Sequence, residues 1–378
     1  MSAEGPSFKL GIEEEYLLVD RKTRDLAHDR PEAFMTALEA KLGDQVKREF
    51  LTSQVELVTQ PCRDIGAVRA ELKHLRRAAA DIAGEFGLAI VAAATHPFAG
   101  YESTTPTDRE RYKILARDLQ GVGRRLIICG MHVHCALEDN ELRIDLMSQI
   151  AYFLPHILAL STSSPFWHGQ DTGLKSYRIA VFDELPRTGI PEQFDSWGEY
   201  QRHVDILVKT GLIEDASKLW WDVRPSARFP TLEMRITDVP TLIEDTLTIA
   251  ALYVCILRML WRLKRANQRW RRYAAMLIGE NRWRAQRYGI DEGLVDFGKG
   301  AIVPYADLLG ELIELVREDA AALGCAAEIA RAPEILRRGT SAHRQRKIYE
   351  EARKAGADKR EALVKVVDVL MEETLEGV

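Results

Sequence analysis

The sequence predicts an α+β protein in which helices pack against an antiparallel sheet. Strand-like and helix-like segments both occur along the chain, and no repeat, low-complexity segment or Pro/Gly/Ser-rich linker divides it. Several strand-like segments carry charged residues at alternate positions, whereas the strands of a buried parallel sheet read as continuous apolar runs. A sheet with one face packed on helices and one polar face accounts for this alternation. We therefore expect a single domain over residues 1–378.

Apolar periodicity assigns the individual elements. The expected strands are residues 8–20, 49–60, 88–96, 126–137, 176–182 and 231–239. The expected helices are residues 66–86, 107–120, 141–161, 195–211, 241–278, 304–323, 333–338, 343–355 and 359–376. The predicted helix 241–278 carries a stripe of arginines, which is typical of a solvated basic face, with phosphate or nucleic-acid contact as the alternative. These arginines are Arg258, Arg262, Arg265, Arg269 and Arg272.

Composition favours a cytoplasmic enzyme over a nucleic-acid-binding or membrane protein. The 378 residues are 46% hydrophobic and 29% charged, which is enough to bury a large core. A net charge of −5 argues against a globally basic nucleic-acid-binding protein. No signal peptide is visible, and no stretch approaches about 18 uninterrupted apolar residues. Five scattered cysteines without a CxxC pair indicate ordinary buried thiols.

Charged side chains concentrate on one face of the predicted sheet. Successive strand residues point to opposite faces, so residues two apart share a face. The pairs that share a face in this way are Glu13 with Glu15, His132 with His134, and Glu233 with Arg235. Glu14 takes the face opposite to Glu13 and Glu15, and Cys135 the face opposite to the histidines. Glu56 stands alone among apolar neighbours, and Arg178 shares a face with Ser176.

A divalent cation is the best explanation for this concentration of acids. Taken singly, each segment also fits a solvated face, a paired core carboxylate or a local ion pair. Several carboxylates on one face would however repel each other, and a lone buried carboxylate would be neutralised. Glutamates with one histidine suit Mg²⁺ or Mn²⁺ better than zinc. Mg²⁺ held by strand carboxylates beside an arginine is how proteins handle a triphosphate, although neither a P-loop nor a Rossmann fingerprint is present.

Six motifs, in consistent order from about residue 8 to 290, resemble the glutamate–cysteine ligase type 2 family, specifically the YbdK-type carboxylate–amine ligases. They are GIEEEYLLVD, QVELVTQP, GMHVHCAL, SSPFWHGQDTGLKSYR, WWDVRPSARFPTLEMRITD and ENRWRAQRYG. The resemblance implies a glutamine-synthetase-like fold, in which a curved antiparallel sheet forms a funnel between helices and ATP enters at one end. Residues 291–378 carry no motif of this kind.

The resemblance also implies a reaction. ATP phosphorylates the γ-carboxylate of glutamate to an acyl phosphate, and an amine then displaces phosphate to form an amide. Cysteine is the amine in the namesake reaction. The expected cofactors are ATP with Mg²⁺, or Mn²⁺ in its place, and the expected partners are small-molecule substrates and a second copy of the chain in a homodimer.

Residue roles follow from the matching motif positions. The implied metal ligands are Glu13, Glu15, Glu56, His134 and Glu233, with His132 as a further candidate. Arg235 would contact the transferring phosphate, and Arg178 would hold the substrate carboxylate by a bidentate fork. With Glu233, these two arginines are the candidate catalytic residues. Trp167 and Ser164 would lie in a substrate-side flap, residues 163–173. Asn281, Arg282 and Arg287 would reach the nucleotide phosphates.

Two rival functions fit part of the same pattern. An H-x-H pair on a strand is also the first ligand pair in the site of binuclear metal-dependent hydrolases. That site, however, needs further ligands at strand ends in a parallel barrel. A non-enzymatic nucleotide- or nucleic-acid-binding protein would use the arginine stripe, and would leave the charged strands unexplained.

Overall fold

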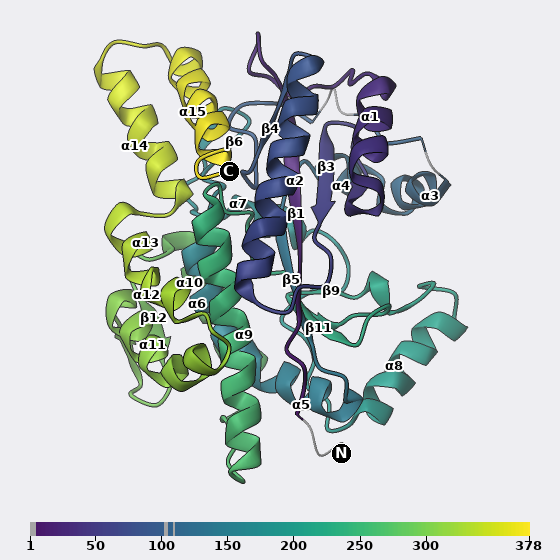
Figure 1. Ribbon diagram of the computed structural model, residues 1–378, viewed down its shortest axis with the longest axis vertical. Helices are drawn as coiled ribbons and strands as arrows, with labels where there is room; N and C mark the ends of the chain where they lie inside the picture. The colour runs from purple at the N-terminus through teal and green to yellow at the C-terminus, as the bar shows by residue number, and fades with distance from the viewer. Residues whose placement is uncertain (1–4, 102–104, 109) are drawn as a thin grey trace.

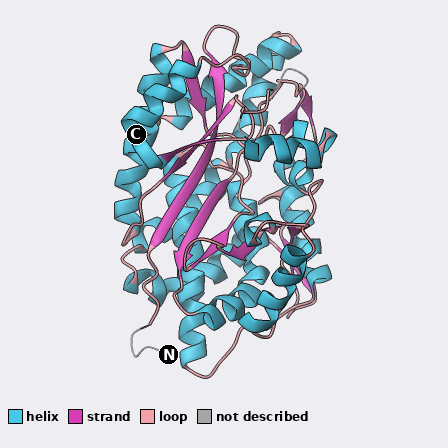
Figure 2. Ribbon diagram, turned by 90° about the vertical axis from the view of Figure 1, so that its right-hand side faces the viewer, coloured by secondary structure: helices cyan, strands magenta, loops and turns pink. Residues whose placement is uncertain are grey.

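The fold was analysed in a computed structural model that describes residues 5–101, 105–108 and 110–378 (Figure 1). Residues 1–4 of the expected domain and residue 109 of the expected helix 107–120 lie outside the described residues. Helices surround a central sheet, and both views show its strands crossing the middle of the molecule (Figures 1 and 2). The predicted α+β class is confirmed.

A seven-stranded sheet forms the centre of the protein, with strand order β10-β11-β5-β1-β3-β2 and β4 paired to β1. Its strands are β1 (Leu10–Asp20), β2 (Val46–Arg48), β3 (Gln54–Val58), β4 (Leu88–Val91), β5 (Met131–Ala136), β10 (Val223–Pro225) and β11 (Thr231–Met234). Every pairing within it is antiparallel, as predicted. The long strand β1 pairs with β5, β3 and β4 at successive positions, so it joins both halves of the sheet.

Among the described residues, three small two-stranded sheets lie outside the central one. They pair β6 (Phe166–Trp167) with β7 (Gln170–Asp171), β8 (Thr188–Gly189) with β9 (Trp220–Trp221), and β12 (Leu294–Asp296) with β13 (Ala301–Val303).

The helices agree with most of the predicted ranges. They are α1 (Glu32–Leu42), α2 (Ile65–Glu85), α3 (Glu110–Leu119), α4 (Gly121–Arg124), α5 (Asn140–Ile150), α6 (Leu154–Ser161), α7 (Tyr177–Phe182), α8 (Trp197–Lys209), α9 (Ile243–Arg265), α10 (Ala275–Tyr288), α11 (Tyr305–Ala322), α12 (Ala326–Ala330), α13 (Ala332–Arg338), α14 (Ser341–Lys354) and α15 (Lys359–Thr374). Helix α2 is capped at its start by Asp64, whose side chain accepts a hydrogen bond from the Ala67 N–H. Helix α1 lies in a segment for which no element was predicted.

The predicted strand 176–182 is wrong, because residues Tyr177–Phe182 form helix α7. The apolar, partly β-branched sequence YRIAVF is typical of a strand. Its surroundings override that preference: the Arg178 N–H donates to the Ser164 hydroxyl at 3.0 Å, and both Ile179 and Val181 are buried. The face-sharing argument for Ser176 and Arg178 therefore does not apply.

The predicted helix 241–278 is also wrong in its second half. Helix α9 ends at Arg265, and α10 starts at Ala275. Asn267 has a φ of +58°, a left-handed conformation that asparagine tolerates better than most residues and that ends a helix. The arginine stripe is thereby broken, and four of its five members pair with acids: Arg258 and Arg262 with Asp319, Arg269 with Asp145, and Arg272 with Asp195.

The helices α2 and α9 cover one face of the sheet (Figure 1). Two helical segments, 140–161 and 243–265, are long and apolar enough to cross a membrane by composition. Their apolar windows are 89% and 78% buried inside the protein, as expected of core helices. The five cysteines are all buried and free, as predicted.

A buried ion pair joins helix α2 to strand β1 on this covered face. Glu14 and Arg76 are fully buried, and the Arg76 Nη2 lies 2.6 Å from the Glu14 Oε1. Glu14 lies between Glu13 and Glu15 in the chain but points to the opposite face, as the strand alternation predicts. The orientation of Glu13 and Glu15 thus depends on the strand that Glu14 anchors.

Candidate active site

The polar face of the sheet brings the predicted acids and histidines together. The strand register places Glu13 opposite His132, Glu233 opposite His134, and Glu15 opposite Glu56. Because these strands are neighbours, side chains far apart in the sequence meet on one face. Glu13 contacts both histidines, since its Oε2 lies 3.1 Å from the His132 Nδ1 and its Oε1 lies 3.2 Å from the His134 Nε2.

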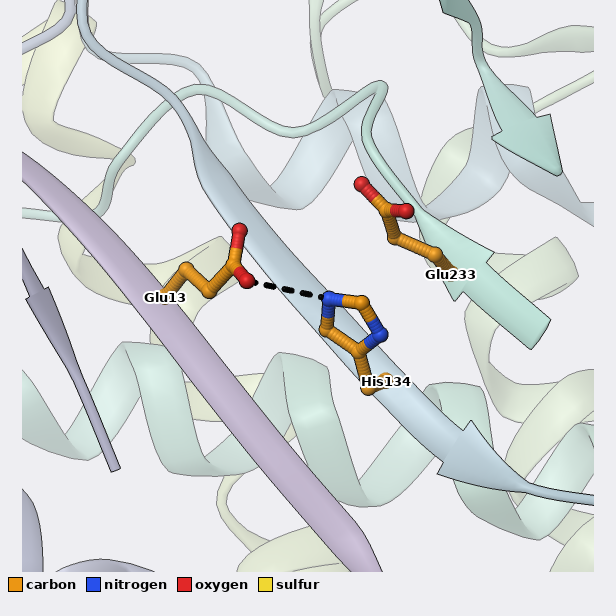
Figure 3. Close-up of side chains that lie close together, drawn as sticks. All are labelled: Glu13, His134 and Glu233. Atoms are coloured by element: carbon orange, nitrogen blue, oxygen red, sulfur yellow. Dashed lines mark ion pairs between the residues drawn. The ribbon is translucent and has the colours of Figure 1, made fainter. Parts of the chain in front are cut away.

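Glu13, His134 and Glu233 form the first group that could hold a metal ion (Figure 3). Their candidate ligand atoms all lie within 4.8 Å of one another. Burial alone would raise the pKa of Glu13, but the two histidines outweigh it and hold that pKa well below its usual value. For Glu233, the charges of Arg235 and Arg224 likewise overcome burial and lower the pKa. Both carboxylates are therefore ionised, which is the state that a cation needs.

Glu15, Glu49 and Glu56 form the second such group. Burial, and then the charge of Glu15, raise the pKa of Glu49 to about 7, and burial with the charge of Glu13 raises that of Glu56 well above its usual value. The Gly130 N–H donates to the Glu15 Oε2 at 2.6 Å and so fixes that carboxylate. Glu49 was not among the predicted site residues; it starts the expected strand 49–60, whereas in the structure it precedes β3 and lies outside the strand.

The donor atoms of both groups fit a hard divalent cation. Carboxylate oxygens predominate, with one imidazole nitrogen, and this combination suits Mg²⁺ or Mn²⁺. Although the His134 Nε2 lies 3.2 Å from Glu13, it makes no hydrogen bond within the described part of the chain. Burial and the neighbouring carboxylates raise the pKa values of Glu49 and Glu56, and a positive ion bound in the second group would relieve this repulsion.

Two arginines flank the first group with different hydrogen bonding. Arg224 forks onto Glu233 at 2.9 and 3.1 Å, and its Nη1 also donates to the carbonyls of Ser217 and Leu219. Arg235 also pairs with Glu233, and its Nη1 lies 3.4 Å from the His132 Nδ1. The buried Arg235 Nε has no hydrogen-bond partner among the described residues. Arg224 is thus engaged in holding Glu233, whereas Arg235 keeps donor capacity for an anion.

Arg178 belongs to helix α7, but its side chain reaches the opposite end of this polar sheet face. Its guanidinium is buried and donates to the carbonyls of Arg235 and Ile236 at 3.2 and 3.3 Å. A Cβ on Gly130 would lie 2.3 Å from the Arg178 Nη2, so any larger residue there would displace the guanidinium from this position. The Arg178 Nε makes no hydrogen bond to the described residues, which leaves it free to bind a carboxylate.

Residues 9–366 match the glutamate–cysteine ligase family 2 (GCS2). The chain belongs to this family. A Rhodospirillum rubrum protein is 60% identical over 98% of this chain and 96% of its own, and a Jannaschia sp. protein is 55% identical over 97% and 96%. Both carry the name "Putative glutamate--cysteine ligase 2". The predicted family is confirmed, and with it a carboxylate–amine ligase; neither rival function gains support.

Two solved structures have the same fold at low sequence identity. The glutamate–cysteine ligase of Francisella tularensis, solved in complex with AMP, has a TM-score of 0.68 at 14% identity, over 97% of this chain and 89% of its own. A bifunctional glutathione synthetase of Pasteurella multocida also has a TM-score of 0.68 at 14% identity, over 98% of this chain and 53% of its own. The glutamine-synthetase-like fold predicted for this ligase is confirmed.

In this GCS2 chain, Ser164 contacts Arg178, and the flap residue Trp167 lies against Tyr177, the residue before it. Ser164 donates to Asp238 at 2.8 Å and accepts from the Arg178 N–H, so it positions the start of α7. Trp167 is half-buried, with its ring 5.3 Å from that of Tyr177. Their direct contact with substrate stays a prediction.

The C-terminal part of the ligase, for which no role was predicted, holds this flap in place. The Ala342 N–H donates to the Thr162 carbonyl at 3.0 Å, and the Gln345 amide donates to the Ser163 carbonyl at 2.8 Å. Arg346 pairs with Asp171 in the flap. Residues of α14 therefore position the loop that leads to Arg178.

The three residues predicted to reach nucleotide phosphates are engaged elsewhere in the structure. Asn281 exchanges two hydrogen bonds with the backbone of Val295. Arg282 pairs with Asp183 and Asp222, and Arg287 donates to the Gly173 carbonyl. The Asp222 carbonyl accepts a hydrogen bond from the Arg235 N–H at 2.8 Å. Arg282 is therefore linked to the site only indirectly, through Asp222. Phosphate contact by these residues stays a prediction.

Proposed function

We propose that this protein is an ATP-dependent ligase that joins the γ-carboxylate of glutamate to an amine, with cysteine as the first amine to test, through an acyl phosphate. The observation that carries the proposal is the pair of three-ligand groups on one sheet face, Glu13–His134–Glu233 and Glu15–Glu49–Glu56. Glu13 and Glu15, two residues apart on β1, contribute one carboxylate to each group, and Arg235 and Arg178 lie along the same face. The AMP complex of the structurally similar Francisella tularensis ligase supports nucleotide use.

The two three-ligand groups are the proposed binding sites of the metal ions that the reaction uses. When bound there, Mg²⁺ or Mn²⁺ would neutralise the phosphate oxygens and let two anions approach each other. Glu13, His134 and Glu233 would hold one ion, and Glu15, Glu49 and Glu56 another. His132 orients Glu13 through the 3.1 Å contact and is a positioning residue in this scheme.

The remaining residues serve the two chemical steps. A substrate carboxylate oxygen attacks the γ-phosphorus and ADP leaves, after which the amine nitrogen attacks the acyl carbon, phosphate leaves and the amine gives up a proton. Arg178 would hold the substrate, and Arg235 would meet the charge that builds on the phosphoryl oxygens. A carboxylate without this activation has no adequate leaving group. The expected homodimer and the cytoplasmic location remain part of the proposal.

The decisive experiment measures ADP release with Mg²⁺ and ATP across panels of amino-acid carboxylates and amines. Release that requires both a carboxylate and an amine, with an amide as product, supports the ligase. Metal-dependent hydrolysis without ATP would overturn the proposal in favour of a hydrolase. Tight, steeply salt-dependent nucleic-acid binding without turnover would overturn it in favour of a binding protein.

Removing Glu49 tests the second metal group. We expect the wild-type protein to bind two Mn²⁺ ions per chain, and Glu49→Gln to bind one, because an amide oxygen is a poorer ligand for a hard cation. Electron paramagnetic resonance of free Mn²⁺ measures this stoichiometry. Glu192→Gln, which changes an exposed carboxylate, is the control and should bind two. Unchanged binding in Glu49→Gln would remove Glu49 from the site.

Replacing Arg178 by lysine tests the substrate end of the face. Lysine keeps the charge but not the bidentate fork, so the KM for the carboxylate substrate should rise by about tenfold or more while the KM for ATP changes little. Steady-state kinetics with each substrate varied in turn measures both constants. Equal increases in the two KM values would mean that Arg178 does not bind the carboxylate.

A further inference from the structure

An exposed aromatic ring stands beside the first metal group. Phe229 is 58% exposed, in contrast to the buried phenylalanines of the core, and lies in the turn between β10 and β11. Its ring centroid is 6.2 Å from that of His134, and the two planes are nearly perpendicular at 88°. The ring therefore borders the site, with most of its surface open to solvent.

The backbone around Phe229 is fixed by hydrogen bonds. The Ser226 hydroxyl accepts from the N–H groups of Arg228 and Phe229, both at 3.3 Å. The Thr231 N–H donates to the Phe229 carbonyl at 2.7 Å, and the Leu137 N–H donates to the Pro230 carbonyl at 2.9 Å. The backbone that carries the ring is therefore already ordered, so a ligand that contacts the ring does not have to order this turn.

The order of groups along β5 shows which part of a ligand would reach this ring. Gly130, His132 and His134 follow one another at two-residue steps, with Arg178 against Gly130 and Phe229 against His134. At a rise of about 3.3 Å per residue, Gly130 and His134 are about 13 Å apart. If the carboxylate substrate binds at Arg178 and the terminal phosphates at the two acidic groups, the rest of the nucleotide extends towards Phe229.

We propose that Phe229 stacks on the purine base of the nucleotide. The inference rests on the proposed function, because it requires that a nucleoside triphosphate bind along this face. A base stacked on an aromatic side chain gains affinity without base-specific hydrogen bonds. Removing the ring should therefore weaken ATP binding by about tenfold, and should leave the binding of a ligand without a base unchanged.

The test compares two ligands, MgATP and magnesium tripolyphosphate, by isothermal titration calorimetry. The variants are Phe229→Ala, Phe229→Trp and the control Ile302→Ala, which removes an apolar side chain of similar exposure, 54%, from the separate β12–β13 hairpin. We expect Phe229→Ala to bind ATP about tenfold more weakly and tripolyphosphate equally well. Phe229→Trp should keep ATP affinity, and stacking should quench the fluorescence of the new indole.

Three results would overturn the inference while leaving the proposed function intact. The first is unchanged ATP binding in Phe229→Ala. The second is an equal loss for ATP and tripolyphosphate, which would mean that Phe229 only supports His134. The third is equal affinity of the wild-type protein for ATP and tripolyphosphate, which would mean that the base contributes nothing to binding. Absence of ATP binding by the wild-type protein would instead overturn the proposed function, and the inference with it.

Discussion

Replacing Arg76 by alanine is expected to destabilise the protein by about 3–5 kcal/mol, because it leaves the Glu14 carboxylate buried without its counter-ion. Arg76 donates to both oxygens of Glu14 at 2.6 and 3.0 Å. It also donates to the carbonyls of Pro240, Thr241 and Thr374, so one guanidinium joins β1, the chain before α9 and the end of α15. Its loss would leave several buried acceptors unsatisfied at once.

The expected loss is measured by thermal and urea unfolding. A fall in Tm of about 4–6 °C corresponds to this range for a protein of this size. Arg77→Ala is the matched control, since the neighbouring arginine on the same helix is exposed, and it should change stability by less than about 0.5 kcal/mol. Equal unfolding curves for the two variants would show that the buried pair contributes little beyond a well-packed apolar residue.

The polar face of the sheet was predictable because strand side chains alternate with a fixed period. The period of two alone assigned Glu13 and Glu15 to one face and Glu14 to the other, and the structure has them so, with Glu14 fully buried. The same rule put His132 and His134 together against Glu13. The regular alternation of strand side chains was therefore enough to predict most of the residues on this face.

The residues that the sequence missed or misassigned depend on contacts between distant segments. Glu49 lies outside any strand, so only the folded chain reveals that it joins Glu15 and Glu56. Arg178 was assigned to a strand by its apolar neighbours, but a helix start held by Ser164 presents it to the site. A single glutamate before Phe50 offers no pattern that could have pointed to a metal group.

The C-terminal part shows the same limit. Residues 291–378 carry none of the six motifs, yet α14 contacts the flap through Ala342, Gln345 and Arg346. These contacts use backbone carbonyls and one surface ion pair, for which almost any polar sequence would serve. A supporting role of this kind leaves no signature in a single sequence.

Replacing Arg235 by alanine is expected to lower kcat at least about 100-fold, or about 2.7 kcal/mol, while ATP affinity changes far less. The reason is that Arg235 has an unpaired buried Nε beside Glu233 and His132, and would strengthen its contact only as charge builds on the phosphoryl group. Glu233→Gln should lower turnover and raise the Mg²⁺ concentration needed for it. Single-turnover ADP formation with ATP and metal varied separately measures both effects.

Comparison with Arg224 and with an exposed arginine separates catalysis from structural support. The Arg224 guanidinium donates to Glu233 and to two backbone carbonyls. Arg224→Ala should therefore lower both Tm and metal affinity. Arg235→Ala should unfold close to the wild-type temperature, as should Arg202→Ala, the exposed control on α8. If Arg235→Ala instead melts many degrees lower and its folded fraction turns over normally, Arg235 is a structural partner of Glu233. Phosphoryl transfer would then have to rely on the metal groups and Arg178 alone.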